Sequence, residues 1–327
     1  MPCEFDLIAR YFTRATPQTL LGPGDDCALL NPSPGMALAI TTDTLVAGTH
    51  FFADTDPVQL GWKTLAVNVS DLAAMGALPR WALLAGSLPT AGAVWIAAFA
   101  DGFFACAERY GVDLIGGDTT RGPLNLCVTA LGEVPAGSAL RRDGARPGDD
   151  LWVSGRPGLA ALGLAHLRRR IVLPDDLGTQ CVGLLQRPVP RVELGLALRR
   201  RALARSAIDV SDGLLADIGH IAERSACAAE IFIAQLPDLP ENVDAELARQ
   251  CQLTGGDDYE LAFSAAPKER EPLSVLSSEL DLPLWRIGRI VEAEGTGKVR
   301  LIGERGEPIT VNRKGFDHFD QDDQAPK

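Results

Sequence analysis

The stretch Val-Asp-Leu-Ile-Gly-Gly-Asp-Thr-Thr at residues 112–120 passes from an apolar run into two glycines and an aspartate. An apolar run that ends in turn-forming residues is typical of a strand. Glycines at the end of a strand let bare backbone approach a phosphate, and Asp118 would then reach a metal bound to that phosphate. A tight hairpin turn uses the same residues, so this motif alone leaves both interpretations open.

Aspartates beside glycines or hydroxyl residues recur along the chain, each at or just beyond an apolar or small-residue stretch. The motifs are GPGDD at 22–26, TTDT at 41–44, NVSD at 68–71, GGDT at 116–119, IDVSDG at 208–213 and GGDD at 255–258. Carboxylate oxygens are the ligands that hard cations such as Mg²⁺ take in proteins. Together these motifs predict carboxylates gathered from across the chain around a site for Mg²⁺ and polyphosphate.

Two of the motifs favour a functional role more strongly than the others do. Residues 57–76 have helical spacing of apolar side chains, and Asp71 falls among them, where an unpaired carboxylate is costly. Residues 208–213 are expected to carry Asp209 and Asp212 on one face of a strand, where both stay ionised most easily around a cation. For residues 41–44, an Asx turn or a helix cap is the competing explanation.

The composition is that of a globular protein with two domains. The chain has 327 residues, of which 46% are hydrophobic and 23% are charged, and this length supports two cores. A polar segment with glycine and proline at residues 140–150 marks a domain boundary. We therefore expect domains at residues 1–138 and 149–319, a linker at 139–148 and a flexible tail at 320–327.

The charge and the apolar pattern limit which partners the protein is expected to bind and in which compartment it is expected to lie. A formal net charge of -12 repels nucleic-acid backbones, and the arginine runs 168–170 and 199–201 are expected at helix C-termini, facing solvent. The apolar residues 91–100 are too few to span a bilayer, and the acidic N-terminal segment lacks a signal-peptide pattern. Seven scattered cysteines are interpreted as small buried hydrophobes. We expect a cytoplasmic protein with no nucleic-acid or membrane partner.

Strands and helices alternate, with some strands adjacent, which predicts an α+β or mixed α/β fold. In the first half, helices are expected at residues 57–76 and 91–110, and strands at 27–30, 81–88 and 124–134. In the second half, the predicted helices are 158–169, 190–201 and 214–224, and the predicted strands are 151–154, 229–233, 259–264, 285–290 and 298–302.

A Walker phosphate loop is absent from the sequence, because GTGK at residues 295–298 lacks its spacing. Protein-kinase, nucleophile-elbow and dinucleotide-binding motifs are absent as well. A nucleotide enzyme with this sequence would therefore depend on carboxylate-bound metals and glycine turns. His50, which follows a glycine-containing loop, could hold a substrate phosphate or lie exposed, and its spacing leaves both possibilities open.

In their order along the chain, these motifs resemble those of the thiamine-monophosphate kinase family. The resemblance rests on GDDCA at 24–28, TTDTLVAGTHF at 41–51, VSDLAAMG at 69–76, IGGDTT at 115–120, DVSDGL at 209–214, GGDDYEL at 255–261 and GFDHF at 315–319. It covers nearly the whole chain. The family belongs to a superfamily that includes aminoimidazole ribonucleotide synthetase and selenophosphate synthetase.

The resemblance implies a two-domain, PurM-like α+β fold with a C-terminal α/β domain. It also implies a homodimer in which two N-terminal sheets pair into a β-barrel. The implied activity is ATP-dependent phosphorylation of thiamine monophosphate to thiamine diphosphate, with Mg²⁺ as cofactor.

The resemblance further implies roles at the matching positions. The implied Mg²⁺ ligands are Asp26, Thr41, Thr42, Asp43, Asp71, Asp118, Asp209 and Asp212; the implied ATP contacts are Gly117, Asp118, Arg142 and Ser211; the implied substrate contacts are His50, Asp257 and Phe316. Asp257 departs from the family pattern, in which many members carry the longer Glu.

The acceptor implied by this family is a phosphate oxygen that is already ionised at neutral pH, so no general base is expected. We expect direct in-line transfer of the γ-phosphoryl group assisted by several Mg²⁺. One alternative keeps the fold and changes the acceptor, as in the synthetase relatives. Cys27 follows the acidic pair, outside the glycine-rich setting of the selenophosphate synthetase cysteine, which argues against that relative. Another alternative is a non-enzymatic acidic Ca²⁺-binding module.

Overall fold

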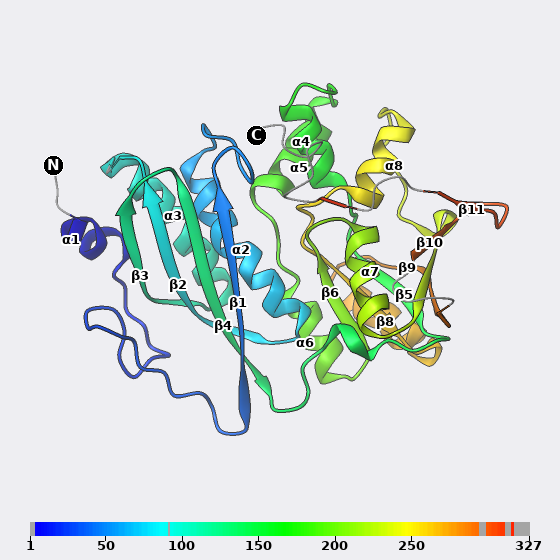
Figure 1. Cartoon of the computed structure of the whole chain (residues 1–327), viewed down its shortest axis with the longest axis horizontal. Coiled ribbons are helices and arrows are strands. Elements are labelled where there is room, and N and C mark those ends of the chain that lie inside the picture. Colours follow the sequence, from blue (N-terminus) through cyan, green and yellow to red (C-terminus); the bar gives the residue numbers. More distant parts are fainter. Residues whose placement is uncertain (1–3, 91, 294–298, 311–314, 317–327) are drawn as a thin grey trace. The chain divides into compact units, whose positions relative to one another are not determined.

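A computed structural model describes residues 4–90, 92–293, 299–310 and 315–316 (Figure 1). The chain divides into two compact units. Unit 1 holds the described residues of Met1–Leu72 and Ala77–Gly137, and unit 2 holds Ala73–Gly76 and the described chain from Ser138 onward. The expected tail at 320–327 lies outside the described residues.

Unit 1 is built on a four-stranded sheet in the order β1-β4-β2-β3. The strands are β1 (Met36–Val46), β2 (Leu78–Leu88), β3 (Asp113–Arg121) and β4 (Asn125–Pro135). β4 runs antiparallel to both of its neighbours, whereas β2 and β3 are parallel. Parallel neighbours need a crossover, and the helix α3 (Ala93–Tyr110) supplies it.

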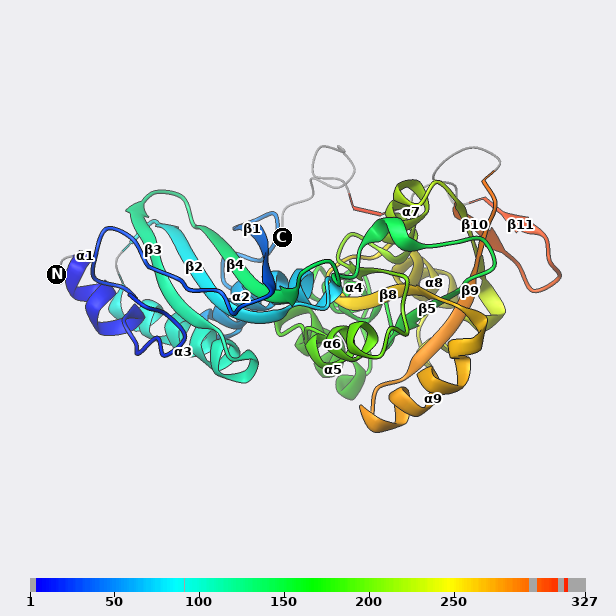
Figure 2. The same ribbon diagram turned by 90° about the horizontal axis from the view of Figure 1, so that it is seen from below.

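The sheet of unit 1 has a helix-covered face and an open face. α2 (Pro57–Ala74) and α3 lie together on one face, as Figure 2 shows, and Leu72 of α2 reaches to within 3.3 Å of the Cβ position of Gly132 on β4. The opposite face, which we call the open face, carries Ile40, 62% exposed, and Leu83, 37% exposed.

Part of the open face is covered by the segment that precedes β1. Ala28 and Leu30 pack there against the buried side chains of Trp81, Ile115 and Leu131. The expected strand at residues 27–30 is not formed, and Leu29 makes only an isolated bridge with Leu21. The apolar residues of this segment cover the face of a sheet, where no strand edge is available for a ladder of hydrogen bonds.

Two glycines bring α2 and α3 into backbone contact. A Cβ at Gly61 would lie 2.0 Å from the carbonyl oxygen of Phe99, and one at Gly102 would lie 1.8 Å from that of Val58. Both positions are therefore closed to any larger residue unless the helices move apart. Aromatic packing continues along α3, where Trp95 stacks on Phe99 with 5.3 Å between ring centroids.

Unit 2 is built on a seven-stranded sheet in the order β11-β10-β7-β9-β5-β8-β6. The strands are β5 (Asp150–Ser154), β6 (Ser206–Val210), β7 (Ala228–Phe232), β8 (Glu260–Ala265), β9 (Leu284–Val291), β10 (Val299–Ile302) and β11 (Pro308–Ile309). The helices are α4 (Leu159–Leu167), α5 (Asp175–Gln186), α6 (Val192–Arg200), α7 (Leu214–Arg224), α8 (Ala245–Thr254) and α9 (Arg270–Glu279).

Helices cover both faces of this sheet, with α7 on one face and α6 and α9 on the other (Figure 2). In β5, Leu151 and Val153 are buried in the α7 core, whereas Trp152 between them is buried in the core with α6 and α9. A strand buried on both faces carries consecutive apolar residues. Such runs at 151–153 in β5 and 261–263 in β8 made both strands predictable from the sequence.

The expected linker at 139–148 packs into unit 2. Leu140 and Ala145 are each 6% exposed and belong to its two cores, and a short 3₁₀ helix spans Arg142–Gly144. The helices α5, α8 and α9 were not predicted, since none of them has a long apolar stripe. In the part of the chain that the structure describes, none of the helices could cross a bilayer.

The cysteines agree in part with their interpretation as buried hydrophobes. Cys106, Cys181, Cys227 and Cys251 are buried, but Cys27 is exposed, so the interpretation was wrong there. All the described cysteines are free thiols.

Candidate active site

β1 and α2 bring three of the expected metal ligands to one place in unit 1. The Thr41 hydroxyl donates a hydrogen bond to the Asp71 carboxylate of α2. The backbone N–H of Asp43 donates to Asn68 Oδ1 at 3.0 Å, and Asn68 is held in turn by its own bond to the Thr64 carbonyl. Because Thr41 and Asp43 are two positions apart on a strand, their side chains share the helix-covered face with Asp71.

Other expected ligands of unit 1 lie on the open face. Thr42 alternates with Thr41, and its hydroxyl donates to the Val128 carbonyl at 3.0 Å. Asp118 pairs in register with Ala85, which pairs with Cys127, which in turn pairs with Thr44 of β1. Residues that pair across neighbouring strands point to the same face, and Thr44 lies two positions from Thr42 on β1. Asp118 therefore also points to the open face.

The strand order separates Asp43 from Asp118 within one chain. β1 and β3 are the two edges of the sheet, with β4 and β2 between them. Three steps between strands amount to about 14 Å. A Mg²⁺ ion binds oxygen at about 2.1 Å, so one ion cannot bridge these two carboxylates inside one chain.

Asp26 lies in the segment that is fastened to the open face. Glu133 of β4 accepts hydrogen bonds from the Ser33 N–H and hydroxyl and from Arg80 Nε, and Arg80 donates to Gln18 at 2.7 Å. Burial raises the pKa of Glu133, but these bonds outweigh it and hold the pKa below its ordinary value. The structure therefore anchors both ends of the loop that carries Asp26, and does so on the face opposite Asp71.

Gly117 has a structural reason to be glycine. A Cβ there would lie 1.8 Å from the Leu84 carbonyl oxygen, and φ is 154°. The β2–β3 register shifts just before this point, between Ala82 and Leu83. The expectation was that glycine leaves room for a phosphate; the structure shows that it first leaves room for the neighbouring strand.

In unit 2, the aspartates of the motif at 208–213 occupy different kinds of backbone. Asp209 is 4% exposed and lies within β6, which ends at Val210. Asp212 is in the loop between β6 and α7. The expectation that both lie on one face of a strand was wrong, because the strand ends before Asp212 and the two residues are three positions apart.

Asp217 organises that loop. Its Oδ2 accepts hydrogen bonds from the backbone N–H groups of Ser211, Asp212 and Gly213 at 3.1, 3.2 and 3.1 Å. Burial and the nearby Asp212 charge raise the pKa of Asp217 to about 7, although the three N–H groups oppose that shift. The backbone N–H groups that precede α7 therefore already donate hydrogen bonds to a carboxylate of that helix.

The segment 255–259 packs on the same loop. A Cβ at Gly256 would lie 2.4 Å from the Ser211 carbonyl oxygen, which accepts the Asp257 N–H at 2.8 Å. Asp257 and Tyr259 both adopt left-handed backbone, with φ of 68° and 53°. Such backbone strain in non-glycine residues concentrates at functional sites.

Asp258, between these two residues, caps a different helix. Its carboxylate accepts the Gly158 N–H at 2.7 Å and the Ala160 N–H at 3.4 Å at the start of α4. Burial raises the pKa of Asp258 well above its ordinary value, against the effect of these two bonds. Asp258 therefore fixes the segment that presents Asp257.

Phe316 reaches the same loop from the far end of the chain. Its N–H donates to the Asp212 carbonyl at 2.9 Å. The structure thus joins two expected substrate contacts, Asp257 and Phe316, to the carbonyl groups of Ser211 and Asp212.

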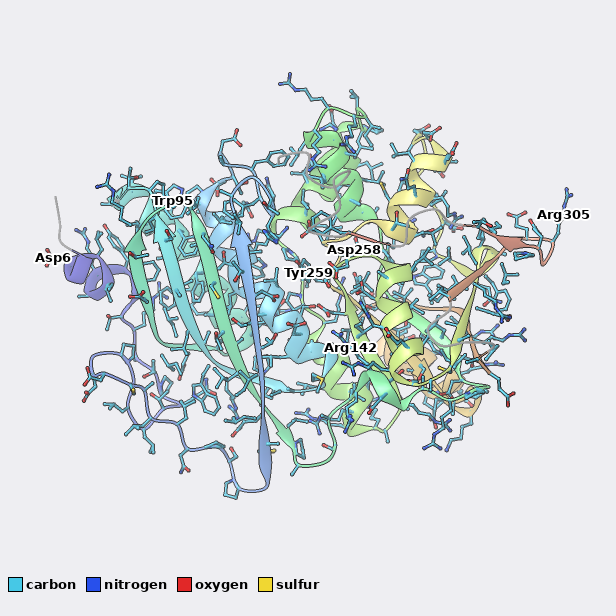
Figure 3. All side chains as sticks on the ribbon, viewed as in Figure 1. Asp6, Trp95, Arg142, Asp258, Tyr259 and Arg305 are labelled. Atoms are coloured by element: carbon cyan, nitrogen blue, oxygen red, sulfur yellow. The ribbon has the colours of Figure 1, made fainter. Side chains whose placement is uncertain are left out.

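Arg142 is not beside Ser211. The Arg142 carbonyl accepts the hydroxyl of Ser225, which follows the last residue of α7, whereas Ser211 precedes the first. Figure 3 shows Arg142 near one end of β6 and Tyr259 near the other. An α7 of this length spans about 16 Å, so the two expected ATP contacts would meet different parts of a nucleotide.

His50 has a defined orientation. Its Nδ1 accepts the Val46 N–H at 3.0 Å, so in the neutral ring Nε2 carries the proton. Nε2 is the atom with which His50 could donate to a phosphate.

Glu260 also belongs to the GGDDYEL motif, but its carboxylate forms an ion pair with Arg191 and is not part of the hydrogen-bond network around Ser211–Gly213. Arg191 Nε and the Ser154 hydroxyl both donate to Glu260 Oε2, at 2.7 and 2.5 Å, and a second Arg191 nitrogen pairs with Oε1. Ser154 is fully buried in unit 2, whereas the Arg191 side chain is 21% exposed.

The donor set fits Mg²⁺ in its chemistry. The expected ligands offer carboxylate and hydroxyl oxygens, as a hard cation requires. Among the described residues, no three His, Cys, Asp or Glu side chains come together as a metal cage. Mg²⁺ ordinarily takes one or two carboxylates with waters and substrate phosphates, so it does not need such a cage.

The sequence reasoning missed Asp217 and Asp258. Asp217 carried a usable signal, because it lies three positions after Leu214 and four before Ile221, on the apolar side of a helix. Asp258 carried no such signal, because its neighbour Asp257 belongs to the same GGDD motif and the sequence does not distinguish the two.

Comparison with known proteins identifies the family. Residues 24–134 match the family described as AIR synthase related protein, N-terminal domain, and residues 146–300 match its C-terminal domain. The thiamine-monophosphate kinase of Escherichia coli (strain K12) is 48% identical over 328 residues, covering 98% of this chain and 99% of that protein. The chain belongs to the thiamine-monophosphate kinase family.

Solved structures of the family agree with the fold. The thiamine-monophosphate kinase of Stenotrophomonas maltophilia K279a is 51% identical with a TM-score of 0.82, covering 93% of this chain and 95% of that one. AaThiL complexed with AMPPCP and TMP is 31% identical with a TM-score of 0.76, covering 90% and 91%. The chain therefore has the two-domain α+β, PurM-like fold that the resemblance implied.

Proposed function

We propose that this protein catalyses ATP-dependent phosphorylation of thiamine monophosphate to thiamine diphosphate. The observation that carries the proposal is similarity over nearly the whole chain to thiamine-monophosphate kinases, one of which was solved with AMPPCP and TMP. The domain bounds 1–138 and 149–319 are part of the same proposal.

The proposed Mg²⁺ ligands come in two groups in unit 1 and a third in unit 2. Thr41, Asp43 and Asp71 form the helix-face group, and Thr42, Asp118 and Asp26 belong to the open face or the segment on it. Unit 2 would supply Asp209 and Asp212. When bound, Mg²⁺ supplies positive charge that offsets the repulsion between two polyanions.

The proposed transfer needs no general base from the protein, because the acceptor oxygen of a phosphate monoester is already ionised at neutral pH. The chain's task is to hold donor and acceptor in line for γ-phosphoryl transfer. Ser211, Gly117 and Asp118 would contact ATP, and Arg142 would add positive charge. His50 Nε2, Asp257 and Phe316 would contact thiamine monophosphate, and the network around Ser211–Gly213 supports placing the last two together.

A homodimer built on the open face is the finer part of the proposal. Met36, Leu38, Ile40 and Leu83 expose apolar side chains on or beside that face, at 39%, 37%, 62% and 37%. Pairing this surface with a second copy would bury it as a barrel. A second copy would also bring a metal ligand close to Asp118. The β1 strand of the same chain cannot do so, because it lies about 14 Å away.

Two inactive variants test the dimer directly. Asp26→Asn and Asp118→Asn proteins are each made, then mixed, unfolded and refolded together. If Asp26 of one copy and Asp118 of the other serve one site, one site in each mixed dimer is intact, so about a quarter of wild-type activity returns. No recovery would refute the shared site, and a monomer at micromolar concentration would refute the dimer.

The activity itself is tested with a panel of acceptors. Wild-type protein, Mg²⁺ and ATP should form thiamine diphosphate, and Asp71→Asn should lower that rate about 100-fold or more. Asp101→Asn, a change on an exposed residue of α3, is the matched control and should keep the wild-type rate. Turnover of another acceptor would favour a synthetase activity. A response to Ca²⁺ without ATP turnover would favour a binding module.

The compartment is also proposed. Free thiols at every described cysteine support a reducing, cytoplasmic location.

A further inference from the structure

One buried carboxylate of unit 2 has no role in the proposed chemistry. Asp217 is 2% exposed and lies in the first turn of α7, behind the loop that carries Ser211 and Asp212. Burying a carboxylate is costly unless it is well hydrogen-bonded, so its retention on the apolar side of a helix needs a reason.

The hydrogen bonds of Asp217 give that reason. One oxygen collects the three consecutive N–H groups of Ser211–Gly213, so the loop cannot turn its amides outward. Amides before a helix would otherwise form an anion site. With the amides turned inward, the loop must present carbonyls and side chains on its other side.

Backbone carbonyls here hold two further segments, the one at 257–259 and the one with Phe316. The carbonyls of Val210, Ser211 and Asp212 accept the N–H groups of Tyr259, Asp257 and Phe316, at 2.8, 2.8 and 2.9 Å. A single loop conformation therefore sets the positions of a proposed metal ligand and of two proposed substrate contacts.

We propose that Asp217 is a positioning residue, which holds the Ser211–Gly213 loop so that Asp212, Asp257 and Phe316 are placed together for metal and substrate. The inference deepens the proposed function and rests on it for the meaning of metal and substrate. Asp217 acts by accepting backbone hydrogen bonds, so the side chain at this position needs an acceptor oxygen within reach of the loop.

The first test measures the loop without any ligand. Hydrogen–deuterium exchange is followed for the amides of Ser211, Asp212 and Gly213 in metal-free protein. Asp217→Leu, which is close in size and has no acceptor, should raise their exchange rates about tenfold or more. Asp217→Asn keeps one acceptor oxygen and should stay within about threefold of wild type. Asp217→Ser, too short to reach the amides, serves if the leucine variant does not fold.

The control is another buried carboxylate of unit 2. Asp149 is 1% exposed and accepts the Arg146 N–H at 2.9 Å and Arg205 at 2.8 Å, close to Cys227 beyond the far end of α7. Asp149→Leu should lower the melting temperature but leave the three loop amides as protected as in wild type. Unchanged loop protection in Asp217→Leu, or equal loss in Asp149→Leu, would overturn the proposal.

The second test measures binding. Calorimetric affinity for thiamine monophosphate and the Mg²⁺ concentration for half-maximal rate should each weaken about 10- to 100-fold in Asp217→Leu, as for other residues that orient ligands. Both should recover in Asp217→Asn and stay unchanged in Asp149→Leu. Wild-type values in Asp217→Leu would sink the positioning role. If wild-type protein has no kinase activity, the proposed function fails, whereas the exchange result still reports on the loop.

Discussion

The ion pair between Glu260 and Arg191 should stabilise unit 2 without serving the active site. Glu260 and Arg191 have side chains 8% and 21% exposed, and Glu260 also accepts the Ser154 hydroxyl at 2.5 Å. Glu260→Gln keeps the size and removes the charge, so the mostly buried guanidinium of Arg191 loses the charge of this carboxylate. Breaking one partner of a buried pair costs about 3–5 kcal/mol.

That cost converts to a large shift in melting temperature. For a domain of this size, 1 kcal/mol lowers the midpoint by about 2–4 °C, so Glu260→Gln should lose about 6–20 °C. The assay is thermal and urea unfolding followed by circular dichroism. The double variant Arg191→Met/Glu260→Leu, with apolar residues of similar size, should regain most of the loss, because no charge is left unpaired.

The kinetic result separates the ion pair from the site. Since the Glu260 carboxylate contacts Ser154 and Arg191 and not the Ser211–Gly213 loop, the KM for thiamine monophosphate should stay within about twofold of wild type. A loss below about 1 kcal/mol, or a KM that rises more than tenfold in folded protein, would refute this reasoning.

Three further predictions follow from packing and protonation. Gly117→Ala should destabilise unit 1 by about 1–3 kcal/mol or more, since its Cβ would lie 1.8 Å from the Leu84 oxygen; a wild-type urea midpoint would contradict this. The raised pKa of Asp258 means that the folded chain binds more protons than the unfolded chain above about pH 4, so stability falls as pH rises through the folded pKa. The free energy of unfolding of wild type, measured relative to that of Asp258→Asn, should therefore be lower at pH 8 than at pH 5. An equal difference between the two proteins at both pH values would argue against the raised pKa. A thiol reagent at pH 8 should label exposed Cys27 quickly and Cys181 only on unfolding, because burial raises the pKa of Cys181 to about 11; equal rates would disagree with the fold.

The sequence predicted the fold and the family well, and for a physical reason. Apolar runs such as residues 151–154 and long apolar stripes such as 57–76 record burial directly, so the elements that form the cores were found. The ordered motifs identified the family. The segment 27–30 misled, because an apolar stretch that covers the face of a sheet has the same pattern as a strand.

The arrangement of the site was less predictable. Alternation along β1 separates Thr42 from Thr41 and Asp43, and strand order separates Asp118 from both, yet neither is visible in a motif. The glycines of the motifs were expected to admit an anion. Gly117 and Gly256 instead admit carbonyl oxygens of the protein itself, a contact that depends on residues far away in the sequence.

The contact between α2 and α3 has a consequence for the choice of metal ion. Gly61 and Gly102 set how closely the two helices approach, and Asp71 lies ten residues, about 15 Å, farther along α2. Mg²⁺ requires near-ideal octahedral geometry at about 2.1 Å, whereas Ca²⁺ accepts longer and more varied bonds. A methyl group at Gly102 should displace α2 and carry Asp71 with it, lowering Mg²⁺ affinity more than Ca²⁺ affinity. Discrimination between the two ions would then be set by helix spacing at a position that touches neither ion.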